Sequence, residues 1–262
     1  MRGGTERGVI MPNSAVKALL CDIGGVLYVG DTPIAGAIEA VRRMKERYSV
    51  RFLTNTTQKS GTQVVKKLQK MGFDIDPSEV ITALDVTKML LEREGCGALF
   101  LLTDDAARFF DDLPKEPCRY VVVGDAQQNF SYESLNRAFR LLLQGGELIA
   151  AAKNRYFKDR DGELSMDAGG FVAALEYASG KEARILGKPS PEFYRLACAS
   201  MGVRPEETVM VGDDIEGDIL GAQEAGIKAV LVRTGKFKPD DLEWGIEPDA
   251  VLDSIAGIGT LF

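Results

Sequence analysis

Residues 18–27 read Ala-Leu-Leu-Cys-Asp-Ile-Gly-Gly-Val-Leu. The short apolar run Ala18–Cys21 is followed by Asp22 and, after Ile23, by a pair of glycines. A short apolar run that ends in turn-forming residues is typical of a buried strand in a parallel sheet. In open α/β sheets, ligands bind beyond the carboxyl ends of the strands. We therefore predict a buried strand over Ala18–Cys21, with Asp22 at the edge of the sheet where ligands bind.

Short apolar runs alternate with amphipathic segments along almost the whole chain. This pattern predicts a Rossmann-like α/β fold, in which helices cover a parallel sheet in three layers. The predicted strands of the outer parts are Ala18–Cys21, Val50–Leu53, Ala183–Leu186, Thr208–Val211 and Ala229–Val232. The predicted helices are Ile34–Arg47, Gly61–Met71, Pro191–Met201 and Ile215–Ala225.

The middle of the chain repeats the pattern with elements of its own. Its predicted strands are Ala98–Leu102, Tyr120–Val123 and Leu148–Ala151, and its predicted helices are Ser78–Glu94, Tyr132–Leu143 and Gly170–Ala178. A segment of this size can form its own domain. We expect a core domain of residues 15–80 and 181–262, an inserted α/β cap domain of residues 81–180, and a disordered leader over residues 1–14.

The composition excludes several classes of protein. A net charge of −7 without a basic run argues against nucleic-acid binding, and no apolar stretch is long enough to span a bilayer. The chain has no histidine, which excludes Ser-His-Asp and Cys-His catalysis and histidine metal sites. Four widely spaced cysteines suggest free thiols and a cytoplasmic protein.

Polar side chains directly follow four predicted strands of the outer part. They are Asp22; Thr54, Asn55 and Thr56; Lys188; and Asp213 and Asp214, with Asp218 shortly after. Each group alone is better explained by a turn, a helix cap or a solvated side chain. Together they predict that carboxylates, hydroxyls and an ammonium group meet at one edge of the sheet, as in a functional site.

The carboxylates of this group suit a magnesium site. Asp22, Asp213 and either Asp214 or Asp218 supply hard oxygen ligands, which Mg²⁺ prefers and zinc does not. A bound cation also explains how several carboxylates tolerate one another, because like charges at close range otherwise raise each other's pKa.

The remaining polar residues suit a phosphoryl group. Thr54 and the amides of Asn55 and Thr56 precede a predicted helix, and helix N-termini favour phosphate oxygens. Lys188 supplies a positive charge for a phosphoryl group in its transition state. We therefore expect a small phosphorylated substrate.

With these motifs in this order, the sequence resembles the haloacid dehalogenase superfamily of phosphohydrolases. The resemblance extends from about Lys17 to Asp241. The asparagine that follows Thr54, Asn55, resembles the NagD-like branch of the superfamily, whose members have a large α/β cap. The motifs are Asp22-Ile-Gly-Gly-Val-Leu, Leu53-Thr-Asn, Gly187-Lys-Pro, and Gly212-Asp-Asp through Asp218.

The resemblance implies a mechanism and a set of roles. Asp22 would attack phosphorus and form an aspartyl-phosphate that water hydrolyses, and relatives with this cap often form homodimers through it. Mg²⁺ would be bound by Asp22, the carbonyl of Gly24 and Asp213. The phosphoryl oxygens would be held by Thr54, Asn55 and Lys188, while Asp214 and Asp218 would act through water or orient Lys188.

The sequence departs from the superfamily at Gly24. Most phosphatases of this kind carry a second aspartate there, which protonates the leaving group. General acid–base help of this sort is typically worth about 10²–10⁴ in rate. We therefore expect a preference for phosphoramidates, pyrophosphate or aryl phosphates over alkyl phosphates. Asp125 or Asp167 of the cap is an alternative source of the proton.

The segment Lys153-Asn-Arg-Tyr-Phe-Lys of the cap is a candidate for substrate contact through Asn154 and Arg155; a solvated basic loop is the alternative.

Two other functions stay open. A binding or regulatory protein without turnover is consistent with Gly24, although such a protein has little need of Asp22. A dehalogenase, in which Asp22 attacks carbon, needs no metal, so the aspartate cluster argues against it.

Overall fold

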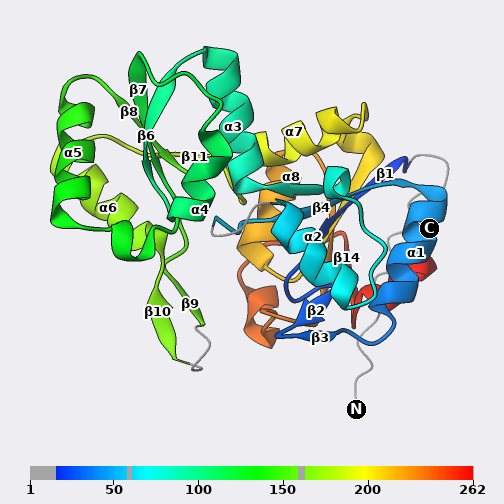
Figure 1. The fold of residues 1–262 in the computed structure, drawn as a ribbon. Helices are drawn as coiled ribbons and strands as arrows, with labels where there is room; N and C mark the ends of the chain where they lie inside the picture. The colour runs from blue at the N-terminus through cyan, green and yellow to red at the C-terminus, as the bar shows by residue number, and fades with distance from the viewer. Residues whose placement is uncertain (1–15, 58–60, 159–162, 262) are drawn as a thin grey trace. The chain divides into compact units, whose positions relative to one another are not determined.

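The structure is a computed structural model that describes residues 16–57, 61–158 and 163–261 (Figure 1). The chain divides into two compact units. The outer unit comprises Met1–Thr54, Val64–Ile81 and Lys188–Phe262, and the inserted unit comprises Asn55–Gln63 and Thr82–Gly187. The predicted leader, residues 1–14, lies outside the described residues.

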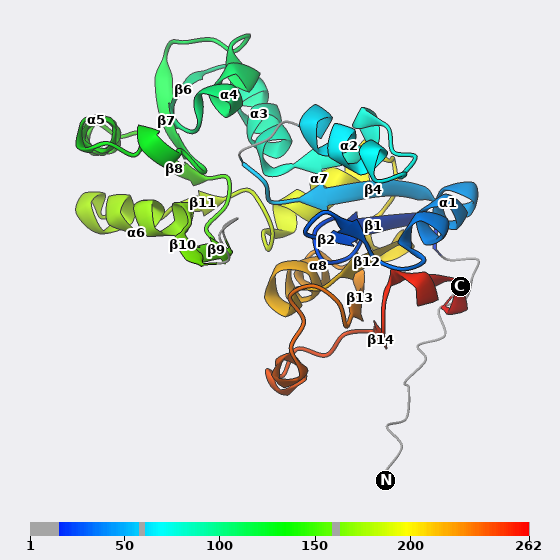
Figure 2. The same cartoon turned by 60° about the horizontal axis from the view of Figure 1, so that its bottom comes forward.

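The outer unit is built on a six-stranded sheet with β1 (Ala18–Asp22) in its interior. All five residues of β1 are buried, as expected of a strand covered on both faces. The strand order is β14 (Ala250–Leu252), β13 (Lys228–Val232), β12 (Thr208–Gly212), β1, β4 (Ser49–Thr54) and β5 (Val80–Thr82). Figure 2 shows β4, β1, β12, β13 and β14 side by side in this order.

The strands from β14 to β4 run parallel, so their carboxyl ends meet at one edge of the sheet. Leu19 and Cys21 of β1 and Phe52 of β4 share one apolar cluster with residues of two helices. These are α1 (Ala37–Arg47) and α2 (Gly61–Lys70). The unit also contains α7 (Pro191–Ser200) and α8 (Gly221–Glu224). The predicted α/β class with a parallel sheet is confirmed.

The inserted unit has its own parallel sheet of four strands. Their order is β11 (Arg184–Ile185), β8 (Glu147–Ala150), β7 (Cys118–Val123) and β6 (Gly97–Leu101). The helices are α3 (Ala83–Glu94), α4 (Asp104–Ala107), α5 (Tyr132–Leu143) and α6 (Ala168–Ser179). One apolar cluster joins β7 and β8 to α5 and α6.

Three of the predicted elements were wrong in part. The strand predicted at Ala183–Leu186 is β11, which pairs with β8 of the inserted unit and not with the outer sheet. The helix predicted over Ser78–Glu94 begins at Ala83, because Val80–Thr82 forms β5 and Thr82 caps the helix with Asp85. The helix predicted from Ile34 begins at Ala37, after Gly36 in a left-handed conformation.

Sequence patterns did not reveal two short hairpins, β2–β3 (Tyr28–Val29 and Thr32–Pro33) and β9–β10 (Tyr156–Lys158 and Leu164–Met166). The helix predicted over Ile215–Ala225 is a π-helical segment, Ile215–Leu220, continued by α8. Within the described part of the chain, no helix has the length and apolar composition needed to cross a bilayer.

Candidate active site

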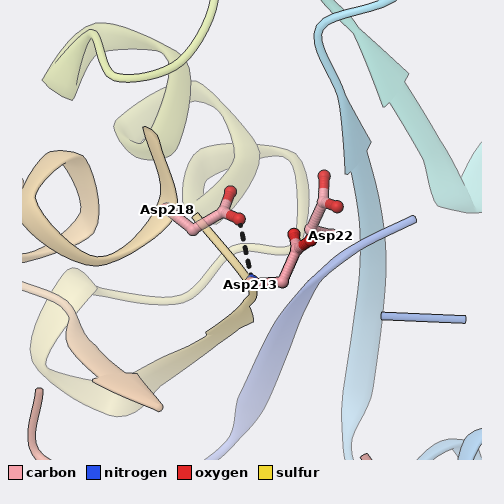
Figure 3. A group of neighbouring side chains, drawn as sticks. All are labelled: Asp22, Asp213 and Asp218. Carbon is pink, nitrogen blue, oxygen red and sulfur yellow. Dashed lines mark hydrogen bonds between the residues drawn. The ribbon is translucent and has the colours of Figure 1, made fainter. Parts of the chain in front are cut away.

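Three buried aspartates meet at the carboxyl edge of the outer sheet (Figure 3). Asp22 is the last residue of β1, Asp213 directly follows β12, and Asp218 lies in the π-helical segment. Their exposed fractions are 7%, 1% and 1%, respectively. One carboxylate oxygen of each residue lies within 4.8 Å of the others. The predicted convergence of Asp22, Asp213 and Asp218 is therefore present.

Lys188 lies against the same carboxylates. Its Nζ donates to Oδ1 of Asp22 and, at 2.7 Å, to Oδ1 of Asp218. Burial of the ammonium group favours its neutral form, but the charges of Asp218 and Asp22 outweigh this and raise the pKa of Lys188 well above its usual value. Lys188 is therefore a buried cation between two carboxylates.

The negative charges of the cluster are not fully compensated. Burial, followed by the charges of Asp22 and Asp218, raises the pKa of Asp213 to about 8. Burial also raises the pKa of Asp218, although Lys188 opposes this shift. Lys188 pairs with only two of the three carboxylates, Asp22 and Asp218, and the carboxylate oxygens are hard ligands. These residues fit a divalent cation such as Mg²⁺, which would lower the cost of keeping the carboxylates ionised.

Asp218 organises the loop that follows β12. Its Oδ2 accepts the backbone N–H groups of Asp213 and Asp214, both at 3.2 Å, while Oδ1 accepts from Lys188. A carboxylate that holds both the loop and the lysine orients them relative to each other. Asp218 therefore connects Lys188 to the loop after β12.

Asp214 has a different set of contacts. Its Oδ1 accepts the N–H groups of Glu216 and Gly217 at 3.2 and 2.8 Å, which caps the π-helical segment. Its Oδ2 accepts from Nζ of Lys236 at 2.8 Å. Burial opposes ionisation of Asp214, but Lys236 and these hydrogen bonds lower its pKa. Asp214 is thus fixed as an ionised cap beside the cluster.

The loop that follows β1 brings the backbone of Gly25 close to Asp213. Gly25 has a φ of 87°, and a Cβ at this position would overlap Oδ2 of Asp213, so the loop requires glycine there. Gly24 is different, because a Cβ would meet no atom within 4 Å beyond its chain neighbours. The missing acidic side chain at Gly24 is therefore not imposed by packing.

The other predicted residues divide between the two units. Thr54 ends β4, one residue beyond Leu53, which is paired with Asp22. Asn55 and Thr56 belong to the inserted unit, in which both are half-buried. Asn154 and Arg155 also belong to the inserted unit, and both side chains are exposed.

The two cap carboxylates considered as proton donors both have local partners. Oδ1 of Asp125 accepts the N–H of Gln127 at 3.0 Å. Asp167 caps α6 by accepting the N–H of Ala168 at 2.7 Å. These bonds explain both side chains as turn and helix-cap residues.

Sequence reasoning missed the loop after β13. The backbone N–H of Lys236 donates to Oδ2 of Asp213 at 2.6 Å, and its ammonium group pairs with Asp214. The rule that polar residues after a parallel strand lie near the site also applies to the end of β13 and could have identified this loop.

Comparisons with known proteins agree with this site. Residues 19–113 match the model of the haloacid dehalogenase-like hydrolases, and residues 185–258 match a related HAD-hydrolase-like model. The rat phospholysine phosphohistidine inorganic pyrophosphate phosphatase is 43% identical over 251 residues, 93% of each chain. The human haloacid dehalogenase-like hydrolase domain-containing protein 2 is 42% identical over 230 residues, 87% of this chain and 88% of the relative.

Solved structures show the same overall architecture. The 4-nitrophenylphosphatase of Thermotoga maritima has a TM-score of 0.86 at 29% identity and covers 95% of this chain and 98% of its own. NagD of Escherichia coli has a TM-score of 0.83 at 26% identity and covers 92% and 97%, respectively. The similarity therefore extends over both units of the chain.

Proposed function

Because this chain belongs to the haloacid dehalogenase-like hydrolases, in their NagD-like branch, we propose that it is a Mg²⁺-dependent phosphohydrolase that acts through an aspartyl-phosphate at Asp22. The observation that supports this most strongly is the position of Asp22. It ends a central strand, is buried, accepts from Lys188, and lies beside two further carboxylates.

The proposed reaction has two displacements at phosphorus. A carboxylate oxygen of Asp22 forms a bond to phosphorus while the bond to the leaving group breaks, and the leaving group keeps the electron pair. Water then attacks phosphorus, releases inorganic phosphate and restores the carboxylate. Lys188 stabilises the negative charge of the transferring group, as a fixed cation does in phosphoryl transfer.

The metal would be held by Asp22, the carbonyl of Gly24 and Asp213, and when bound it neutralises charge on the phosphoryl oxygens. Thr54, Asn55 and Thr56 are proposed to hold phosphoryl oxygens together with Lys188. Asp218 orients Lys188, and Asp214 holds the adjoining loop through its cap.

The absence of an acidic side chain at Gly24 favours a particular class of substrate. Without an acid at this position, a leaving group that departs readily has an advantage over an alkoxide. Phosphoramidates, pyrophosphate and aryl phosphates have such leaving groups, and the names of the rat relative and of the Thermotoga maritima structure include members of all three classes. We propose that Asn154 and Arg155 of the inserted unit contact the rest of the substrate.

We also propose, from the resemblance, that residues 81–180 act as a cap domain on a core of residues 15–80 and 181–262. The protein would act in the cytoplasm as a homodimer that pairs through this cap.

The test of the proposal is phosphate release from imidodiphosphate, measured for wild type and for Asp22→Asn with and without a chelator. We expect wild-type release that depends on Mg²⁺ and a loss of at least about 10³-fold in Asp22→Asn, because the nucleophile is gone. The absence of release by folded, Mg²⁺-loaded wild type on imidodiphosphate, pyrophosphate and 4-nitrophenyl phosphate would favour the alternative, a phosphate-binding or regulatory protein without turnover.

A further inference from the structure

The loop after β13, residues Thr234–Lys236, connects two parts of the active site that are far apart in sequence. The backbone N–H of Lys236 donates to Oδ2 of Asp213 at 2.6 Å. The hydroxyl of Thr234 donates to the carbonyl oxygen of Gly25 at 2.6 Å. One short loop therefore holds both a buried carboxylate and the loop that follows Asp22.

The packing around Asp213 leaves no room for a side chain at Gly25 or at Gly235. Gly235 has a φ of 63° and Gly25 a φ of 87°, a region that favours glycine. A Cβ on either residue would overlap Oδ2 of Asp213. The carboxylate thus lies between two glycine backbones, and its orientation is set by both of them.

The hydrogen bond from Lys236 also distinguishes the two oxygens of Asp213. Oδ2 accepts this bond, and no hydrogen bond to Oδ1 is made within the part of the chain that the structure describes. A carboxylate with one oxygen held by the backbone presents the other in a defined direction. Such support of a ligand by a neighbouring group is a common way of tuning metal sites.

We infer that Thr234, Gly235 and Lys236 form a positioning loop that sets the spacing of Asp213 and the Gly24–Gly25 backbone before Mg²⁺ binds. This rests on the proposed function, in which Asp213 and the Gly24 carbonyl are metal ligands. Thr234 is the residue that tests it best. Its side chain is neutral, so its removal changes the geometry of the site without changing the charge that Mg²⁺ meets.

The experiment measures Mg²⁺ binding to the full chain by calorimetry in the absence of substrate. Thr234→Val removes one partly buried hydrogen bond and keeps the shape, so we expect Kd for Mg²⁺ to rise about fivefold. Thr234→Ser keeps the hydroxyl and should restore wild-type binding. Gly235→Ala displaces the Asp213 carboxylate and should weaken binding by more than Thr234→Val.

Arg233→Met is the matched control. Arg233 directly precedes this loop but pairs with Asp253 at 3.0 Å, with 50% and 90% of the two side chains exposed, so the change should leave Kd for Mg²⁺ unaltered. Thermal unfolding of each variant separates positioning from simple stability. A Thr234→Val protein that melts earlier but binds Mg²⁺ as tightly as wild type would overturn the inference, as would a wild type that binds no Mg²⁺.

The two proposals can fail separately. A wild type that binds Mg²⁺ but hydrolyses none of the proposed substrates would overturn the proposed function, and the Kd of Thr234→Val would still decide the role of the loop.

Discussion

The two parallel sheets of this protein offer polar side chains at their carboxyl ends in very different ways. In the outer sheet, Asp22 and Asp213 are buried beside each other, and Lys188 pairs with both Asp22 and Asp218. In the inserted sheet, Asp125 follows β7 and accepts a hydrogen bond from the backbone N–H of Gln127 in its own turn. Lys153 follows β8 and pairs with Glu176 at 2.8 Å.

This difference shows that a position at the end of a strand is not enough to make a reactive site. In the inserted unit, a local turn accounts for Asp125 and an ion pair accounts for Lys153. The carboxylates of the outer unit face one another under burial, which raises the pKa of Asp213 and Asp218. Such uncompensated charge is typical of sites that bind ions or perform chemistry.

The largest expected effect compares the two lysines directly. Lys188→Met leaves Asp22 and Asp218 without their cation and removes the charge proposed to stabilise the phosphoryl group, so kcat/KM should fall by about 10³ or more. Lys153→Met removes a partly exposed pair and should change kcat/KM by less than about threefold. Steady-state kinetics on imidodiphosphate measures both, with circular dichroism to show that each variant is folded. Equal losses in the two variants would remove the distinction between the sheets.

The next effect is a gain of activity. Gly24→Asp places an acid where packing leaves space, and turnover of an alkyl phosphate such as glycerol phosphate should rise about 10²-fold. Gly24→Asn has nearly the same shape without the acid and serves as the control. A similar rise in both variants would show that size and not proton donation is responsible. No rise in either would show that Gly24 does not limit the choice of substrate.

A smaller effect is expected in the inserted unit. Arg155→Met should raise KM for imidodiphosphate about tenfold with kcat nearly unchanged, because a contact that is equal in ground and transition states affects binding alone. Asn154→Ala should act in the same direction. If Arg155→Met lowered kcat instead and left KM unchanged, the residue would belong with the chemistry and not with substrate binding.

The smallest effect is in the pH dependence of stability. The pKa of Asp213 is raised from 3.8 to about 8, so the folded, metal-free protein holds a proton that the unfolded chain releases at lower pH. The contribution of Asp213 to the stability of the folded protein is fully present below pH 3.8 and is lost as the pH rises to about 8. If Mg²⁺ binds Asp213 as proposed, it displaces this proton, so the Tm increase at a fixed Mg²⁺ concentration should be larger at pH 8 than at pH 6, by a few degrees.

Asp213→Asn is the control for this measurement, since it removes the titrating group, and it should abolish the difference between the two pH values. Asp125→Asn in the inserted unit should preserve it. An equal Mg²⁺ shift in wild type at both pH values would contradict the assignment of Asp213 to the metal.

The sequence predicted the site where the relevant signal was local. Asp22 and Asp213 each end a short apolar run, and this pattern is enough to place them at the edge of a parallel sheet. Lys188 was predicted for the wrong reason, because the strand before it belongs to the inserted sheet. Its position depends on the chain returning to the outer unit at that residue.

The contacts that sequence could not predict are those made through backbone or space. The hydrogen bond from the backbone N–H of Lys236 to Asp213 depends on the register between β12 and β13, which no residue type encodes. The open space around Gly24 is a property of the folded loop. The start of α3 was, in contrast, readable in retrospect, because Thr82 and Asp85 form a capping box.

The most direct test of the central claim is to trap the phosphorylated enzyme. Wild type mixed with ³²P-labelled pyrophosphate and Mg²⁺, then quenched in acid within milliseconds, should carry label on the peptide that contains Asp22, as identified by mass spectrometry. Asp22→Asn should carry none. Rapid phosphate release by a wild-type enzyme that is never labelled at Asp22, or label on another residue, would contradict the account.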